Sequence, residues 1–388
     1  MSAVDHDPIA FIDLGAQYRR LRQDIDSAIE GVLEDGRFVM GPAVAGLETA
    51  LAARAGAATA VTCASGTDAL LIALMAEGIG PGDAVFVPGF TFPATAGVVA
   101  LLGAAPVFVD VEDASCLMGA NDLAARVART AAEGRLVPKA VIAVDLFGQA
   151  ADYETLAPLA AEHGMLLIDD AAQSFGGASG GRPVGALAPV TTTSFYPAKP
   201  LGCYGDGGAL FTDDEARAAR WRSIREHGAG AGKYDIVRIG LNSRMDTLQA
   251  AILQVKLAAF DAEIEARERV AGWYDSALAG VVELPGRLPG RRSTWAQYTI
   301  RLPRRDAVQT ALAERGVPTA VHYPVPMHLQ PAYDAAGSGP GSLPVSERLS
   351  RQVLSLPMHP DLDEATAGRI AAAVRDAVRD VMRDAAGA

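Results

Sequence analysis

The chain has 388 residues, of which 50% are hydrophobic and 21% are charged, and its formal net charge is −12 at pH 7. This length exceeds one typical core, so we expect a folded protein with one large and one small domain. The negative charge argues against binding to nucleic acid or to an anionic membrane, because the field of the protein repels phosphate polymers.

The N-terminal segment and the cysteines indicate a cytoplasmic protein without a metal centre. Residues 1–10 contain two acids and lack the basic and apolar regions of a signal peptide. No run of about 18 apolar residues is present to span a bilayer. The three cysteines are odd in number and widely spaced, which fits neither a disulfide framework nor a zinc site.

The first predicted element is a helix between residues 11 and 35. Its apolar residues Leu21, Ile25 and Ile29 recur at a spacing of four, and Gly36 follows as a C-cap.

From residue 57 onward, short apolar runs alternate with helical patterns. Continuous apolar runs are typical of parallel strands covered by helices on both faces. Ligands of such sheets bind at the carboxyl ends of the strands. The predicted strands are 60–63, 84–88, 106–111, 140–147 and 165–170, and the helices between them are 67–78, 91–103 and 153–164.

The ends of the first two strands carry groups that suit a ligand. Ser65, Gly66 and Thr67 would form an anion site at the N-terminus of a helix. Helix capping by Thr67 explains the same residues equally well. Phe92 follows the second strand and could stack on a planar ligand, whereas Phe90 fits a core position.

The strand at 165–170 ends in two acids, Asp169 and Asp170. Adjacent strand residues point to opposite faces, so at most one of the two can face a given ligand. A buried carboxylate here needs a cationic partner, whereas capping of the next turn is the alternative.

Lys199 has the most informative context of any single residue. It precedes a glycine-rich loop within the stretch 191–214, and the chain has only three other lysines, Lys139, Lys233 and Lys256. Unlike arginine, lysine can lose its proton and attack a carbonyl, so this position suits a reactive amine. A surface lysine beside a flexible loop is the alternative interpretation.

Two apparent motifs are rejected. Residues 227–234 resemble a phosphate loop, but His227 and Tyr234 replace its first glycine and its Ser/Thr. The histidines show no metal spacing, because His322 and His328 lie in a proline-bounded loop without a shared helical face.

After Gly240 the pattern changes to one long helix. Leu253, Leu257 and Phe260 share a face of this helix, which would bridge two domains. A half-buried strand, a proline-bounded loop and a terminal amphipathic helix are predicted beyond it. We therefore expect a large domain at residues 1–250 and a small α+β domain at residues 251–388.

Together, the strand ends supply an amine, an anion site, a carboxylate and a flat apolar face. Pyridoxal 5′-phosphate (PLP) needs this set, because it has an aldehyde, a phosphate, a ring nitrogen and a planar ring. A carboxylate would keep the ring nitrogen protonated, so that the ring withdraws electrons from the substrate. The candidates are Lys199 for the amine, Gly66, Thr67 and Ser194 for the phosphate, Asp170 for the nitrogen and Phe92 for the ring face.

Seven motifs follow one another between about residues 11 and 362: SGTDAL, FPAT, DLFGQ, DDAAQSFG, SFYPAKPLGCYGDGGA, GLNSRMDTLQAAIL and VHYPVPMHLQPAY. On these motifs the chain resembles the DegT/DnrJ/EryC1/StrS sugar aminotransferases, PLP-dependent enzymes of fold type I. The resemblance implies an α/β large domain, with a mostly parallel central sheet between helices, and a smaller α+β domain. It further implies Lys199 as the Schiff-base residue, Asp170 as the pyridinium partner and Gln173 facing the ring hydroxyl. It implies a homodimer with shared active sites, in which Asn242 completes the neighbour's phosphate site.

Within this family, the chain is most similar to enzymes that aminate UDP-2-acetamido-2-deoxy-3-oxo-glucuronate with L-glutamate. Arg244, His322 and Tyr323 would then bind the sugar carboxylate from the partner subunit, although an interface ion pair is the alternative for Arg244. We expect ping-pong transamination, in which Lys199 first holds the cofactor and then moves a proton.

Three other functions are compatible with this fold. A dTDP-4-keto-6-deoxysugar aminotransferase and a non-catalytic regulatory protein remain alternatives. A PLP-dependent sugar dehydratase is disfavoured, because such enzymes resemble this chain but replace the lysine with histidine.

Overall fold

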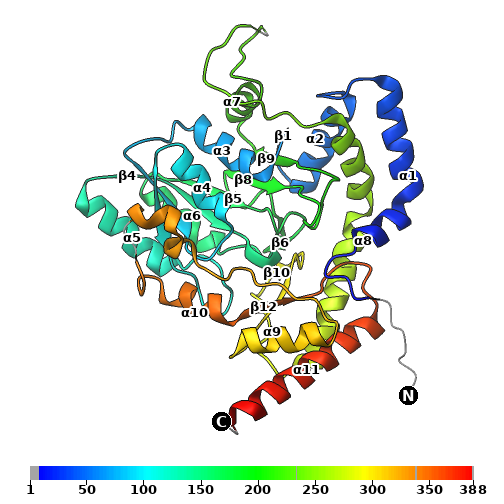
Figure 1. Cartoon of the computed structure of the whole chain (residues 1–388). Helices are drawn as coiled ribbons and strands as arrows, with labels where there is room; N and C mark the ends of the chain where they lie inside the picture. The colour runs from blue at the N-terminus through cyan, green and yellow to red at the C-terminus, as the bar shows by residue number, and fades with distance from the viewer. Residues whose placement is uncertain (1–7, 233, 337–338, 387–388) are drawn as a thin grey trace.

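The computed structural model describes residues 8–232, 234–336 and 339–386. Lys233 and the first seven residues, on which two expectations above depend, lie outside the described residues. Figure 1 shows a central sheet enclosed by helices, with the C-terminal elements gathered on one side of it. None of the described helices is both long and apolar enough to cross a membrane.

The central sheet has seven strands in the order β1-β9-β8-β5-β4-β2-β3. Strand β9 runs antiparallel to β1 and β8, and the other pairings are parallel. The predicted mostly parallel sheet is therefore confirmed. The predicted strand 140–147 instead ends at Val144, because a 3₁₀ turn, η1 (Leu146–Gly148), follows it. The strands are β1 Thr59–Cys63, β2 Asp83–Pro88, β3 Ala105–Val109, β4 Val137–Val144, β5 Leu166–Asp170, β8 Val190–Ser194 and β9 Gly208–Thr212.

Helices cover both faces of this sheet, as the continuous apolar strands predicted. Val85 and Val87 of β2 pack on one face with α3, α4 and α7. Ala84 and Phe86 of the same strand pack on the other face with α5 and α6. The sheet-covering helices are α2 Pro42–Ala55, α3 Gly66–Ala76, α4 Pro93–Leu101, α5 Ala120–Glu133, α6 Tyr153–Glu162 and α7 Glu215–Arg225.

The long helix α8 (Thr247–Leu278) belongs to two hydrophobic cores. Its first half places Leu253 and Phe260 in a core with α2 and with β9 of the sheet. Its second half places Tyr274 and Leu278 in a separate core with the C-terminal elements. The N-terminal helix α1 (Leu14–Asp35) packs along α8.

The second core lies between α8 and a two-stranded antiparallel sheet. We propose that it forms the small domain predicted at residues 251–388, with α8 shared between the domains. Its elements are β11 Tyr298–Arg301, α9 Arg305–Glu314, β12 Val353–Leu356 and α11 Glu364–Ala386. The remaining short elements are β6 Ala178–Ser179, β7 Arg182–Pro183, β10 Arg291–Arg292, η2 Met327–Leu329, η3 Pro331–Ala336 and α10 Pro344–Gln352.

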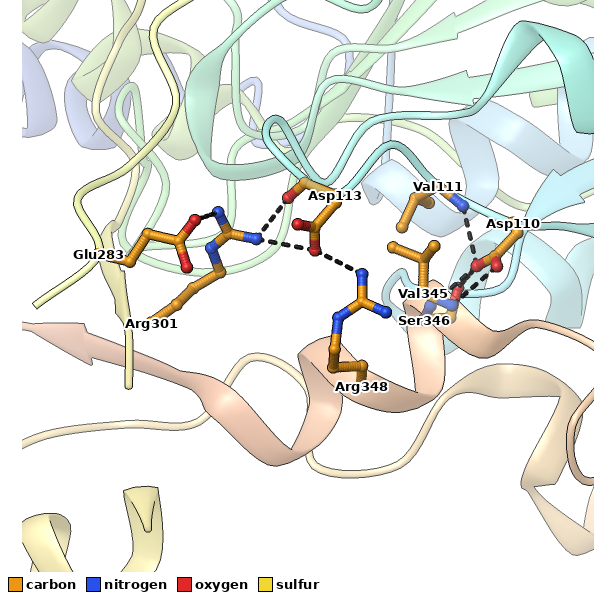
Figure 2. Close-up of polar contacts among 8 residues, drawn as sticks. All are labelled: Asp110, Val111, Asp113, Glu283, Arg301, Val345, Ser346 and Arg348. Carbon is orange, nitrogen blue, oxygen red and sulfur yellow. Dashed lines mark hydrogen bonds and ion pairs between the residues drawn. The ribbon is translucent and has the colours of Figure 1, made fainter. Parts of the chain in front are cut away.

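The loop after β3 fastens the large sheet to the C-terminal elements (Figure 2). The Asp110 carboxylate accepts hydrogen bonds from the backbone N–H groups of Val345 and Ser346, at the start of α10. Asp113 pairs with Arg301 of β11 and with Arg348 of α10. Because the partners are more than 180 residues apart in sequence, these contacts fix tertiary arrangement rather than local structure.

Candidate active site

The ends of β1 and β8 meet at the N-terminus of α3. A Cβ atom built on Gly66 would lie 2.6 Å from the Cβ of Ser194, so only glycine fits at this approach. The side chain of Ser65 accepts a hydrogen bond from Asp68 N and caps α3. The alternative of helix capping by Thr67 is therefore wrong. The free N–H groups of the first turn remain available to an anion.

Asp169 and Asp170 point to opposite faces of β5, as their adjacency predicted. Asp169 bonds to Tyr153 and Thr191. The Asp170 carboxylate accepts hydrogen bonds from Thr95 Oγ1 and from the N–H of Ala172, both at 3.2 Å. Asp170 is 6% exposed, so its carboxylate is buried.

Lys199 lies close enough to Asp170 for each charge to affect the other. Burial raises the pKa of Asp170, and the positive charge of Lys199 partly offsets the rise. Burial lowers the pKa of Lys199, and Asp170 opposes that change. Among the described residues, no ion pair joins the two groups. The amine and the carboxylate are therefore not in direct contact, but each still influences the pKa of the other.

Gln173 has a fixed amide orientation. Its Oε1 accepts a hydrogen bond of 2.6 Å from the N–H of Phe147, and an N–H can only donate. Its Nε2 therefore points the other way, where the hydroxyl of Tyr323 lies at 3.3 Å. This NH₂ group is therefore a donor on the side of Tyr323.

Two aromatic residues flank Tyr323. The rings of Phe90 and Phe92 each lie 6.2 Å from the Tyr323 ring, measured between centroids. Phe90 is 1% exposed and Phe92 is 54% exposed. Phe90 is thus the predicted core residue, and Phe92 offers an open face to a planar ligand.

His322 adjoins the same region. Burial and the nearby charge of Lys199 lower the pKa of His322, which favours the neutral ring. Its Nδ1 lies 2.9 Å from Ser355 Oγ.

The segment that contains Asn242 and Arg244 lies beside the first turn of α3. Ser243, between them, donates to the Asp68 carboxylate and accepts from the N–H of Ala64. Asn242 is exposed, and the Nε of Arg244 is buried without a hydrogen-bond partner. Within the described part of the chain, neither side chain forms a hydrogen bond with Lys199, Asp170 or Gln173.

Sequence reasoning missed the contacts that support these residues. Thr95 was recognised as part of FPAT, yet its bond to Asp170 joins residues 75 apart, which no local pattern reveals. The role of Ser65 could have been read from its place directly before the helix, because Ser is a preferred N-cap residue.

A mostly parallel sheet between helices, with a carboxylate and a separated amine at its ligand-binding edge, is the arrangement of the PLP-dependent fold type I class. Residues 19–375 match the model of the DegT/DnrJ/EryC1/StrS aminotransferase family, so the chain belongs to that family. It is a PLP-dependent aminotransferase.

Relatives and a solved structure support this assignment. The chain is 46% identical to the UDP-2-acetamido-2-deoxy-3-oxo-D-glucuronate aminotransferase of Pseudomonas aeruginosa, over 94% of this chain and 99% of that protein. It is 42% identical to the dTDP-3-amino-3,4,6-trideoxy-alpha-D-glucose transaminase of Streptomyces venezuelae, over 95% and 96%. The crystal structure of a DegT DnrJ EryC1 StrS aminotransferase from Brucella abortus superposes with a TM-score of 0.93 at 51% identity, covering 95% of this chain and 99% of that one.

The residues present fit PLP. The close approach of Gly66 to Ser194 brings two strand ends together at the free amides of α3, where a phosphate is stabilised. In the described chain, Asp170 forms no ion pair, although the charge of Lys199 affects its pKa. Its carboxylate is therefore suited to pair with a protonated ring nitrogen. The fixed NH₂ of Gln173 suits a ring oxygen, and the exposed face of Phe92 suits the ring itself.

Proposed function

We propose that this enzyme transfers the amino group of L-glutamate to a keto group of a nucleotide-linked sugar. The arrangement of Asp170, Lys199 and the oriented amide of Gln173 carries the proposal, because together they match the nitrogen, aldehyde and hydroxyl of PLP. When bound, PLP supplies a ring that withdraws electrons from a substrate carbon as it loses a proton.

The residues of this chain have separate tasks in that reaction. Asp170 would supply the negative charge for the ring nitrogen, and Thr95 with the Ala172 amide orient its two oxygens. The depressed pKa of Lys199 makes its amine available as a nucleophile and then as a base that carries a proton at Nζ. The phosphate would be held by Gly66, Thr67 and Ser194.

We infer that the preferred sugar is UDP-2-acetamido-2-deoxy-3-oxo-glucuronate. Similarity to the Pseudomonas aeruginosa enzyme supports this choice. The unpaired Nε of Arg244 also supports it, because a guanidinium group binds a carboxylate through two donors. His322 and Tyr323 are proposed to contact the same sugar.

The proposed enzyme is a cytoplasmic homodimer that acts on small molecules. The net charge of −12 favours small-molecule partners over nucleic acid, and the three free, buried cysteines suit a reducing compartment. Exposed apolar residues Ile236, Val237 and Ile239 precede the Asn242 segment and provide a surface for a second subunit.

A panel of nucleotide-linked ketosugars tests the proposal. Each sugar is incubated with the purified enzyme, PLP and L-glutamate, and the products are identified by mass spectrometry together with 2-oxoglutarate. We expect amination of the 3-oxo-glucuronate sugar and none with Lys199→Ala in repeated turnovers. Reaction with dTDP-4-keto sugars alone would favour the alternative substrate. If glutamate gives no 2-oxoglutarate with any of the sugars, a regulatory role is left.

A further inference from the structure

Behind the candidate active site lies a buried pair of acids that the proposed reaction does not use. Asp145 follows β4, Asp169 lies in β5, and Tyr153 begins α6. Asp145 and Asp169 are 0% exposed and Tyr153 is 3% exposed. Among the ion pairs of the described residues, none includes either acid, so no cation balances two buried negative charges.

The number of protons in this cluster follows from the hydrogen bonds of Tyr153. Its hydroxyl lies 2.8 Å from Oδ1 of Asp145 and 2.8 Å from Oδ1 of Asp169. A phenol has one proton and donates to one oxygen only. The second short contact is a hydrogen bond only where the other carboxyl carries a proton and donates to the tyrosine.

The remaining donors decide which acid keeps its proton. Asp145 also accepts from the N–H of Ala151 at 2.7 Å and from the hydroxyl of Ser174 at 2.6 Å. Apart from its contact with Tyr153, the Asp169 carboxylate accepts among the described residues only from the hydroxyl of Thr191, at 3.2 Å. More donors stabilise the charged form, so Asp145 is the stronger acid. The pKa directions agree, since burial raises the pKa of Asp145 to about 6 and that of Asp169 much further.

The ionised acid also connects the two segments that hold Gln173. Ser174, bonded to Asp145, directly follows Gln173 in the chain. Phe147, whose N–H fixes the Gln173 amide, lies two residues after Asp145. The N–H of Asp145 further donates to the carbonyl of Asp170. Asp145 is thus hydrogen-bonded to the residue after Gln173 and to the backbone of Asp170.

We propose that Asp145 and Asp169 hold a single proton between them through Tyr153, that Asp145 is the ionised member, and that Asp145 is a positioning residue for Gln173. The location of the proton stands on the geometry of this cluster alone. The effect on the cofactor rests on the function proposed above.

Infrared spectroscopy of the whole chain without PLP tests the proton. Asp145→Asn and Asp169→Asn keep the shape of each side chain and are compared with the unaltered protein at neutral pH. We expect the carbonyl band of a protonated carboxylic acid in the unaltered protein and in Asp145→Asn, and its loss in Asp169→Asn. A band lost in Asp145→Asn instead, or absent from the unaltered protein, would overturn the proposal.

Unfolding provides a second measurement that needs no cofactor. A buried acid with a raised pKa stays protonated in the folded state after the unfolded state has released its proton, so stability falls as pH rises. Relative to Asp169→Asn, the unfolding constant of the unaltered protein should rise about tenfold per pH unit between pH 6 and 7. A ratio that is constant over this range would contradict a neutral Asp169.

The absorption band of bound PLP then reports the charge near the cofactor. The negative charge of Asp145 stabilises the protonated form of the group that gives this band. Its removal in Asp145→Asn should lower the pH at which the band titrates by roughly half a pKa unit or more, the effect expected of one nearby charge at an effective dielectric constant of about 20. Asp169→Asn, which replaces a neutral acid, should leave that pH unchanged. Equal shifts in both variants would contradict the assignment. A protein that binds no PLP would defeat the proposed function and leave the infrared result to decide the proton.

Discussion

At the scale of single residues, the site depends on charges that are buried near one another without direct contact. Asp170 is buried and Lys199 is partly buried, and each moderates the effect of burial on the pKa of the other. A charged ligand placed between them gains more from each charge than it would in water, because the local dielectric constant is low.

Asp170→Asn should reduce kcat/KM for glutamate by about 10²-fold or more, because the amide keeps the shape of Asp170 but loses its charge. Steady-state kinetics with saturating PLP measure the change. Thr95→Val is the matched control: it removes one hydrogen bond to Asp170 and should cost roughly tenfold or less. An Asp170→Asn enzyme within tenfold of the unaltered one would contradict the assigned role.

Lys256 is a second buried amine, placed behind the loop that carries Lys199. Its Nζ donates to the carbonyl of Gly202 at 2.7 Å and lies 4.0 Å from the centre of the Tyr204 ring. Burial lowers its pKa to about 8. Below pH 8 both folded and unfolded states carry the charge. Between about pH 8 and 10.4 only the unfolded state does, so stability rises with pH.

Lys256→Met should therefore remove a gain in stability at alkaline pH. Urea unfolding of both proteins at pH 7.5 and pH 10 measures it. Relative to the variant, the unaltered protein should gain up to about 3 kcal/mol over this interval. A difference in unfolding free energy that does not change with pH would show that the amine titrates normally.

At the scale of elements, the contacts of the loop after β3 are unequal in strength. Asp110 is 8% exposed and accepts hydrogen bonds from two amides of α10, from the hydroxyl of Ser346 and from the amide of Val111. The side chain of Asp113 is 51% exposed, and its ion pairs are correspondingly screened by water.

Asp110→Ala should thus destabilise the protein by about 2 to 4 kcal/mol, because it leaves a helix N-terminus and several buried donors without partners. Asp113→Ala on the same loop is the control and should cost about 1 kcal/mol or less. Thermal or urea unfolding ranks the two. The opposite order would mean that the arginine pairs, rather than the helix cap, join these elements.

The elements with strong periodicity or continuous apolar runs were predictable, and the contacts between distant elements were not. The strands of the sheet, the bridging helix and the opposite directions of Asp169 and Asp170 follow from local pattern. The helix α7 was not predicted, since four arginines among its eleven residues obscure an apolar face. The bonds of Asp110 to α10 and of Thr95 to Asp170 depend on tertiary pairing over long sequence separations.

At the scale of the whole molecule, the Arg244 Nε, which is buried without a partner among the described residues, and the exposed Asn242 lead us to predict sites shared between subunits. Lys199→Ala and Arg244→Ala proteins should each be inactive or severely impaired alone. Mixed after reversible dissociation, they should regain activity, because one site of each mixed dimer then has both residues. The same variants mixed without dissociation are the control. No recovery in the mixed dimer would place both residues in one subunit's site.

The helix α8 has a consequence for how the molecule comes apart. This helix has 32 residues, is about 48 Å long, and contributes side chains to both hydrophobic cores. Proteolytic removal of either half would strip apolar surface from the other, so neither fragment retains a complete interior. Loss of structure should accordingly be cooperative across the chain, and an isolated C-terminal fragment should aggregate rather than fold.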